Sequence, residues 1–76
     1  MAKFDSRIDA LVVETRTSWD PSVGDLPPQD RQWVAHTIHQ NPSIARNIEY
    51  IRTHSGFIRH ITVTVEDIQQ LYLAKS

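Results

Sequence analysis

Three side chains that can recognise a partner recur at helical spacing in the middle of the chain. Arg46, Tyr50 and His54 stand at positions i, i+4 and i+8, and Asn47 adds an amide beside them, so a helix would place them on one face. A guanidinium, a flat ring and an amide are typical of protein-contact surfaces, and also of phosphate contact and base stacking. The predicted partner-binding surface therefore consists of Arg46, Asn47, Tyr50 and His54, flanked by Arg31 and Arg59.

Two histidines are spaced so that a helix could bring both imidazoles to one metal ion. They are His36 and His39, three residues apart. On a helical wheel they lie opposite Trp33, Val34 and Ile38, which would face the core. The spacing indicates no third ligand, so we expect solvent-exposed histidines, no metal and no other cofactor.

Sequence signatures of enzymes are missing. The chain has two glycines, Gly24 and Gly56, so it cannot form a glycine-rich phosphate loop. It contains neither a G-x-S-x-G elbow nor an H-E-x-x-H motif, and no pair of carboxylates has a spacing that indicates acid–base chemistry. We therefore interpret the protein as a non-enzymatic binding module.

Length and composition limit the choice of class further. The chain has 76 residues, a net charge of −1 and no cysteine, which predicts one small domain, residues 1–76, without disulfides. No apolar run approaches the roughly 18 residues that span a bilayer, so we expect a cytoplasmic protein without membrane contact. Four arginines and a single acid lie in residues 31–60, whereas residues 1–30 hold six of the nine acids. Such an asymmetry can mark a partner surface.

Helical periodicity predicts the elements that must position these side chains. An apolar stripe over 4–18 (Phe4, Ile8, Leu11, Val12, Thr15) predicts a first helix. Prolines and a glycine make 19–28 a long loop, held to the core by apolar side chains. A second helix is predicted at 28–40, where Pro28 suits its first turn, and a third at 42–54, which Gly56 would end.

The stretch from 57 to 64 carries two conflicting signals. Ile61, Val63 and Val65 alternate with threonines, as in a half-buried strand. Thr64 and Asp67, three apart, have the form of a capping box that starts a helix. Because no other segment shows convincing alternation, we interpret 57–63 as an extended connector and 65–74 as a fourth helix.

These expectations give an all-α fold, a compact bundle of about four short helices. The alternative is an α+β fold in which 57–64 is a strand, paired with a homodimer partner or with a short strand in the loop. The predicted function is regulatory docking of a helix face on a protein partner. The alternative is a small DNA-binding transcriptional regulator, in which 28–40 and 42–54 form a helix-turn-helix-like pair. A homo-oligomer is compatible with either function.

Overall fold

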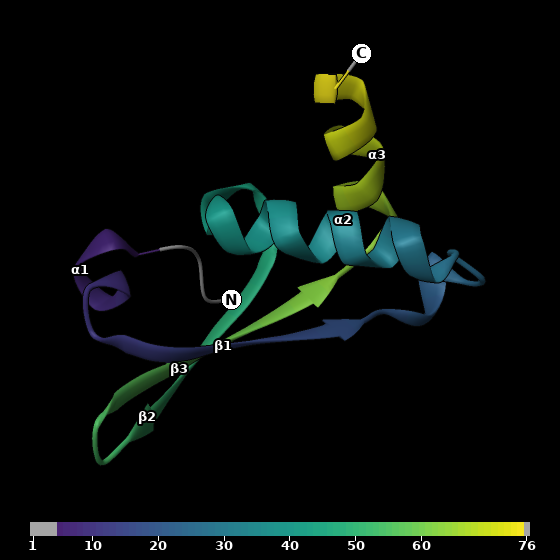
Figure 1. Ribbon diagram of the computed structural model, residues 1–76. Coiled ribbons are helices and arrows are strands. Elements are labelled where there is room, and N and C mark those ends of the chain that lie inside the picture. The colour runs from purple at the N-terminus through teal and green to yellow at the C-terminus, as the bar shows by residue number, and fades with distance from the viewer. Residues whose placement is uncertain (1–4, 76) are drawn as a thin grey trace.

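The computed structural model describes residues 5–75. These residues form a small α+β domain, with three helices and a three-stranded mixed sheet (Figure 1). The predicted all-α bundle is therefore wrong. The elements, in chain order, are α1 (Ser6–Asp9), β1 (Val12–Trp19), the 3₁₀ turn η1 (Pro21–Val23), α2 (Pro28–Gln40), the 3₁₀ turn η2 (Pro42–Ile44), β2 (Asn47–Thr53), β3 (Gly56–Val63) and α3 (Val65–Lys75).

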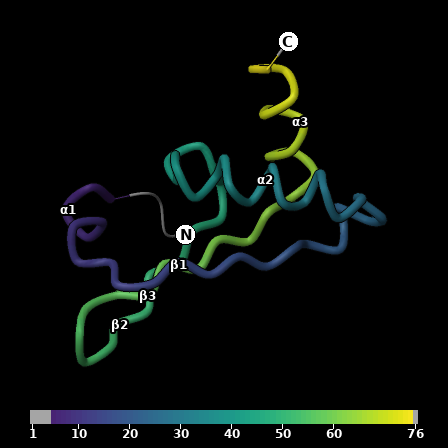
Figure 2. The backbone as a smooth tube through the Cα atoms, in the orientation of Figure 1, coloured from purple at the N-terminus to yellow at the C-terminus, as the bar shows by residue number. Residues whose placement is uncertain are grey.

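The strand order in the sheet is β1-β3-β2. β1 runs parallel to β3, so that Trp19 lies opposite Val63, and β2 runs antiparallel to β3, with Thr53 opposite Gly56. Figure 2 shows that β1 lies beside β3 of the β2–β3 hairpin, although the two strands are distant in sequence. The stretch 57–64 thus lies mostly in a strand, as in the alternative interpretation, but both of its partners come from the same chain and neither comes from the loop.

The predicted helix at 4–18 is replaced by a short helix and a strand. α1 ends at Asp9, and β1 begins at Val12. In β1, Thr15 and Thr17 pair with core-facing residues of β3, whereas Glu14 and Arg16 pair with residues of the other face. Threonine is a good strand residue but only weakly apolar, so the inward positions of β1 do not form a recognisable apolar alternation.

The predicted helix at 42–54 is also wrong. Pro42–Ile44 forms a 3₁₀ turn, and Asn47–Thr53 forms the strand β2. Ile48 and Tyr50 face the core in alternation, and a tight turn at His54 and Ser55 leads into β3. The residues 28–40 and 42–54 therefore do not form a helix-turn-helix pair.

The other two predicted helices are found close to their predicted bounds. α2 is Pro28–Gln40 and α3 is Val65–Lys75. The capping box at the start of α3 is formed: Thr64 N donates to Asp67 Oδ2 at 3.1 Å, and Asp67 N donates to Thr64 Oγ1 at 3.4 Å. Local signals were sufficient for both helices.

The hydrophobic core lies on one face of the sheet. α2 and α3 pack against this face, and α1 reaches its far end through an ion pair between Asp9 and Arg59 of β3 (Figure 1). The buried apolar side chains are Val34, Ile38, Ala45, Ile48, Ile61, Val63, Ile68 and Leu71. The opposite face holds alternate residues such as Ser18 and His60, whose Oγ and Nε2 atoms lie 2.8 Å apart.

The 19–28 loop is held to the core, as expected. Val23 and Leu26 pack against the core, and so does Trp19, which ends β1. Asp20 caps η1 by accepting from Ser22 N at 2.9 Å, and hydrogen bonds from the Ser22 hydroxyl and backbone hold the pKa of Asp20 below its ordinary value. The loop is therefore an ordered support for the start of α2.

No helix within residues 5–75 has the length and hydropathy that a bilayer-crossing segment needs.

Candidate protein-binding site

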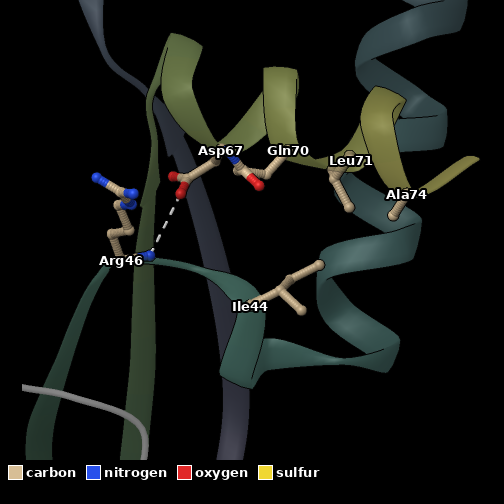
Figure 3. Close-up of a pocket in the computed structure, with 6 residues that line it drawn as sticks. All are labelled: Ile44, Arg46, Asp67, Gln70, Leu71 and Ala74. Carbon is tan, nitrogen blue, oxygen red and sulfur yellow. Dashed lines mark hydrogen bonds between the residues drawn. The ribbon is translucent and has the colours of Figure 1, made fainter.

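A hollow of about 390 Å³ opens between η2 and α3 (Figure 3). This volume is near the lower limit of small-ligand pockets and suits one or two side chains of a partner. Its lining residues come from the η2–β2 junction and from one side of α3. They are Ile44, Arg46, Asp67, Gln70, Leu71 and Ala74.

The apolar part of the hollow lies between η2 and the C-terminal half of α3. Ile44 points across the space toward Leu71 and Ala74 (Figure 3). Leu71 is buried and continuous with the core, whereas the Ile44 side chain remains 37% exposed. An apolar side chain that enters here would remove the exposed surface of Ile44 from water, which is the main source of favourable binding free energy.

Asp67 fixes the two walls of the hollow relative to each other. Its carboxylate is 4% exposed and accepts from Thr64 N and Thr64 Oγ1, at 3.1 and 3.2 Å. The other oxygen accepts from the backbone N–H of Arg46 at 3.4 Å, the dashed line in Figure 3. One carboxylate therefore completes the capping box of α3 and ties this helix to the start of β2.

A pair of opposite charges stands at the rim. Arg46 Nη1 and Glu66 Oε2 lie 2.5 Å apart, and both side chains are about 60% exposed, at 60% and 61%. Ion pairs this exposed contribute little to stability, because water screens both charges. The Arg46 guanidinium can therefore exchange Glu66 for a carboxylate of a partner at small cost.

Among the predicted site residues, Arg46 alone lines the hollow. Arg31 instead braces the 19–28 loop: its Nε and Nη2 atoms donate to the carbonyl oxygens of Leu26 and Gly24, each at 2.9 Å. Its guanidinium also lies 5.1 Å from the ring centroid of Trp19, a cation–π contact. These contacts give Arg31 a structural role.

The remaining predicted residues are distributed over different parts of the domain. Arg59 is 5% exposed on the core face, paired with Asp9, and burial lowers the pKa of its guanidinium. Tyr50 lies on the same face, and its hydroxyl accepts from Asp5 N at 3.3 Å. Asn47 faces the opposite side of the sheet, and His54 is exposed in the hairpin turn. The six residues thus do not share one surface, and their part in binding stays a prediction.

The paired histidines lie on α2 as exposed side chains. His39 Nε2 is 2.5 Å from Thr17 Oγ1, which joins α2 to β1. Within residues 5–75, no group of three or more histidine, cysteine, aspartate or glutamate side chains is arranged to hold a metal ion.

Sequence reasoning missed most of the hollow. Ile44 lies within the predicted helix 42–54, which does not form, and Gln70 and Ala74 give no signal of their own. Asp67 was recognised as a helix cap, but its bond to Arg46 depends on the position of β2. Only the capping box, at one end of the site, could have been found from local spacing.

Comparison of the chain with protein-family models, with curated proteins and with solved structures gives no significant match. The function must therefore be inferred from the geometry of the site itself.

Proposed function

We propose that the protein is a non-enzymatic, cytoplasmic binding module that docks a segment of a protein partner into the hollow between η2 and α3. The observation that carries this proposal is the combination of an open apolar hollow with an exposed guanidinium at its rim. Partner anchors typically fill such a pocket with a large apolar side chain, while polar groups at the rim select the orientation.

The chemistry of the lining defines the partner segment. Ile44, Leu71 and Ala74 suit an aliphatic or aromatic anchor side chain. Arg46 suits a carboxylate adjacent to the anchor, because a guanidinium can bind both carboxylate oxygens at once. The partner is therefore a segment that carries an apolar residue next to aspartate or glutamate.

The ionisable groups of the site support binding over catalysis. Asp67 is the one buried carboxylate at the hollow, and its oxygens accept hydrogen bonds from Thr64 and from the Arg46 backbone. A general base needs a carboxylate that can reach a substrate proton. Asp67 is committed to holding the fold.

Nucleic acid is the less favoured partner. A helix-turn-helix mechanism would need a recognition helix over 42–54, where the chain forms η2 and β2. The net charge of −1 adds no electrostatic attraction to phosphates.

The absence of cysteine from the sequence fits the proposed cytoplasmic location, because the cytoplasm is a reducing compartment in which disulfides are rare.

Filling the hollow should weaken binding of such a segment. Peptides selected from a randomised display library on the immobilised protein are expected to share an apolar residue beside an acid. Ala74→Gln places a longer side chain in the hollow and should raise the Kd of a selected peptide about tenfold or more, as measured by fluorescence polarisation.

Leu73→Gln is the matched control for this variant. Leu73 is the neighbouring residue of α3, is 67% exposed and does not line the hollow. Its replacement should leave the Kd within about twofold of the wild-type value, as expected for a position outside the contact. Equal effects of the two substitutions, or failure to select any peptide, would remove the hollow as the binding site.

A further inference from the structure

The outer edge of β1 is open within residues 5–75. The strand order β1-β3-β2 makes β1 one border of the sheet, and Figure 1 shows it running along that border from α1 to η1. An edge strand presents backbone N–H and C=O groups that can pair with another strand. Two large apolar side chains are exposed here: Leu11, just before this strand, is 57% exposed, and Val13, its second residue, is 56% exposed. The edge therefore combines free pairing capacity with uncovered apolar surface.

The sequence of β1 is complementary to itself in one antiparallel register. With Thr15 opposite its own copy, Glu14 of each chain lies opposite Arg16 of the other, on the same face of the sheet. Moving the axis to Glu14 or to Arg16 would instead oppose like charges, which is destabilising. A change of pairing partner by one position, instead of two, would turn the side chains of the second strand to the other face of the sheet. Charge thus selects the register centred on Thr15.

The exposed apolar residues lie at the two ends of this register. Counted along the sequence, Val13 falls opposite Thr17 of the second copy, and Leu11, which precedes β1, falls beside Trp19 of the second copy. The irregularity in the β1–β3 ladder falls between Val12 and Glu14, so regular alternation begins at Glu14 and is interrupted at Val13. The charged centre therefore fixes the register, and the second copy covers part of the apolar surface beside it.

β2, the other border strand, lacks this property. Its acid and its base, Glu49 and Arg52, lie on opposite faces because they are three positions apart, an odd offset along the strand. No antiparallel self-pairing of β2 can therefore bring the two charges together. Self-complementarity is specific to β1.

We propose that a second copy of this chain pairs with the edge of β1, antiparallel and with a two-fold axis at Thr15. The two three-stranded sheets then join into one continuous sheet across the dimer. Glu14 and Arg16, which now pair within one chain at 2.5 Å, exchange partners across the interface. Both side chains are about half exposed, at 49% and 58%, so their replacement leaves the core of the monomer untouched.

Sedimentation velocity across a concentration series tests this dimer. The wild-type protein should show a monomer–dimer equilibrium. Arg16→Glu opposes acids across the axis and Glu14→Arg opposes bases, so each variant alone should dimerise at least about tenfold more weakly. A wild-type protein that sediments as a monomer at every concentration would overturn the proposal.

Mixing the two variants provides a test that does not depend on loss of association. Arg16→Glu and Glu14→Arg chains are complementary to each other, so an equimolar mixture should form a heterodimer that neither variant forms alone. The double variant E14R/R16E restores both pairs and should dimerise within about threefold of the wild type. Dimers that persist in the single variants, or a mixture that remains monomeric, would place the interface elsewhere.

Discussion

Replacement of Gly56 by alanine is expected to destabilise the protein by about 3 kcal/mol, a large part of the stability of so small a domain. Gly56 begins β3 with φ of +145°, a conformation that L side chains rarely adopt. A Cβ added there would clash with the carbonyl oxygen of Leu11, which accepts from Phe57 N at 3.0 Å. The clash is with backbone, so relief requires β1 and β3 to separate at this end. Urea denaturation followed by circular dichroism measures the loss.

Gly24 provides a matched control for this substitution. It also has a positive φ, of +64°, but an added Cβ would meet no atom within 4 Å. Gly24→Ala should therefore cost backbone strain without a clash, about 1–2 kcal/mol. Equal losses in the two variants would show that Leu11 does not approach Gly56 as closely as described.

Removal of the Asp67 carboxylate is expected to cost about 2–3 kcal/mol. Asp67→Ala removes the carboxylate half of the capping box at the start of α3 and leaves the N–H groups of Thr64 and Arg46 without their acceptor. Since the hydrogen bond to Arg46 joins α3 to the start of β2, we expect the loss to exceed that of a cap on an isolated helix. The free energy of unfolding in urea measures this effect.

Glu66→Ala is the control for this variant, because it removes a negative charge next to Asp67 without removing a buried hydrogen-bond acceptor. Glu66 is 61% exposed and paired with Arg46 at the surface, so Glu66→Ala should change stability by no more than about 0.5 kcal/mol. If Asp67→Ala cost no more than Glu66→Ala, the carboxylate of Asp67 would not be the link between the two elements.

Local signals were enough to predict α2 and α3. Pro28 and Asp30 mark the first turn of α2, and the Thr64–Asp67 box marks the start of α3. Each of these signals lies within a few residues of the element that it specifies. These signals therefore do not depend on contacts with distant parts of the chain.

The sheet could not be predicted in the same way, because its pairings are distant in sequence. Trp19 lies opposite Val63, and the inward residues of β1 are threonines that give no strong apolar alternation. In β2, Ile48 and Ile51 fit a helical stripe as well as a strand, although they lie on opposite faces. Short apolar patterns of this kind fit both periods, and only the strand partners decide between them.

The candidate site depends on the same distant pairings. Ile44 and Arg46 meet α3 because β2 pairs with β3, and α3 follows β3 directly. Arg46 was predicted to bind a partner as part of a helix face, but its neighbours at the hollow are Ile44 of η2 and residues of α3. The residue type was enough to identify Arg46 as a group that can bind a partner. The surface on which Arg46 lies could be identified only from the fold.

Reciprocal charge exchange at Arg46 tests the proposed docking most directly. Fluorescence polarisation would compare the wild-type protein and Arg46→Glu, each with a selected apolar–acidic peptide and with its lysine-substituted counterpart. We predict that Arg46→Glu binds the acidic peptide about fivefold more weakly and the lysine peptide about fivefold more tightly than the wild type does, as expected for one exposed ion pair. Affinities that do not depend on the charge at residue 46 would contradict docking at the hollow.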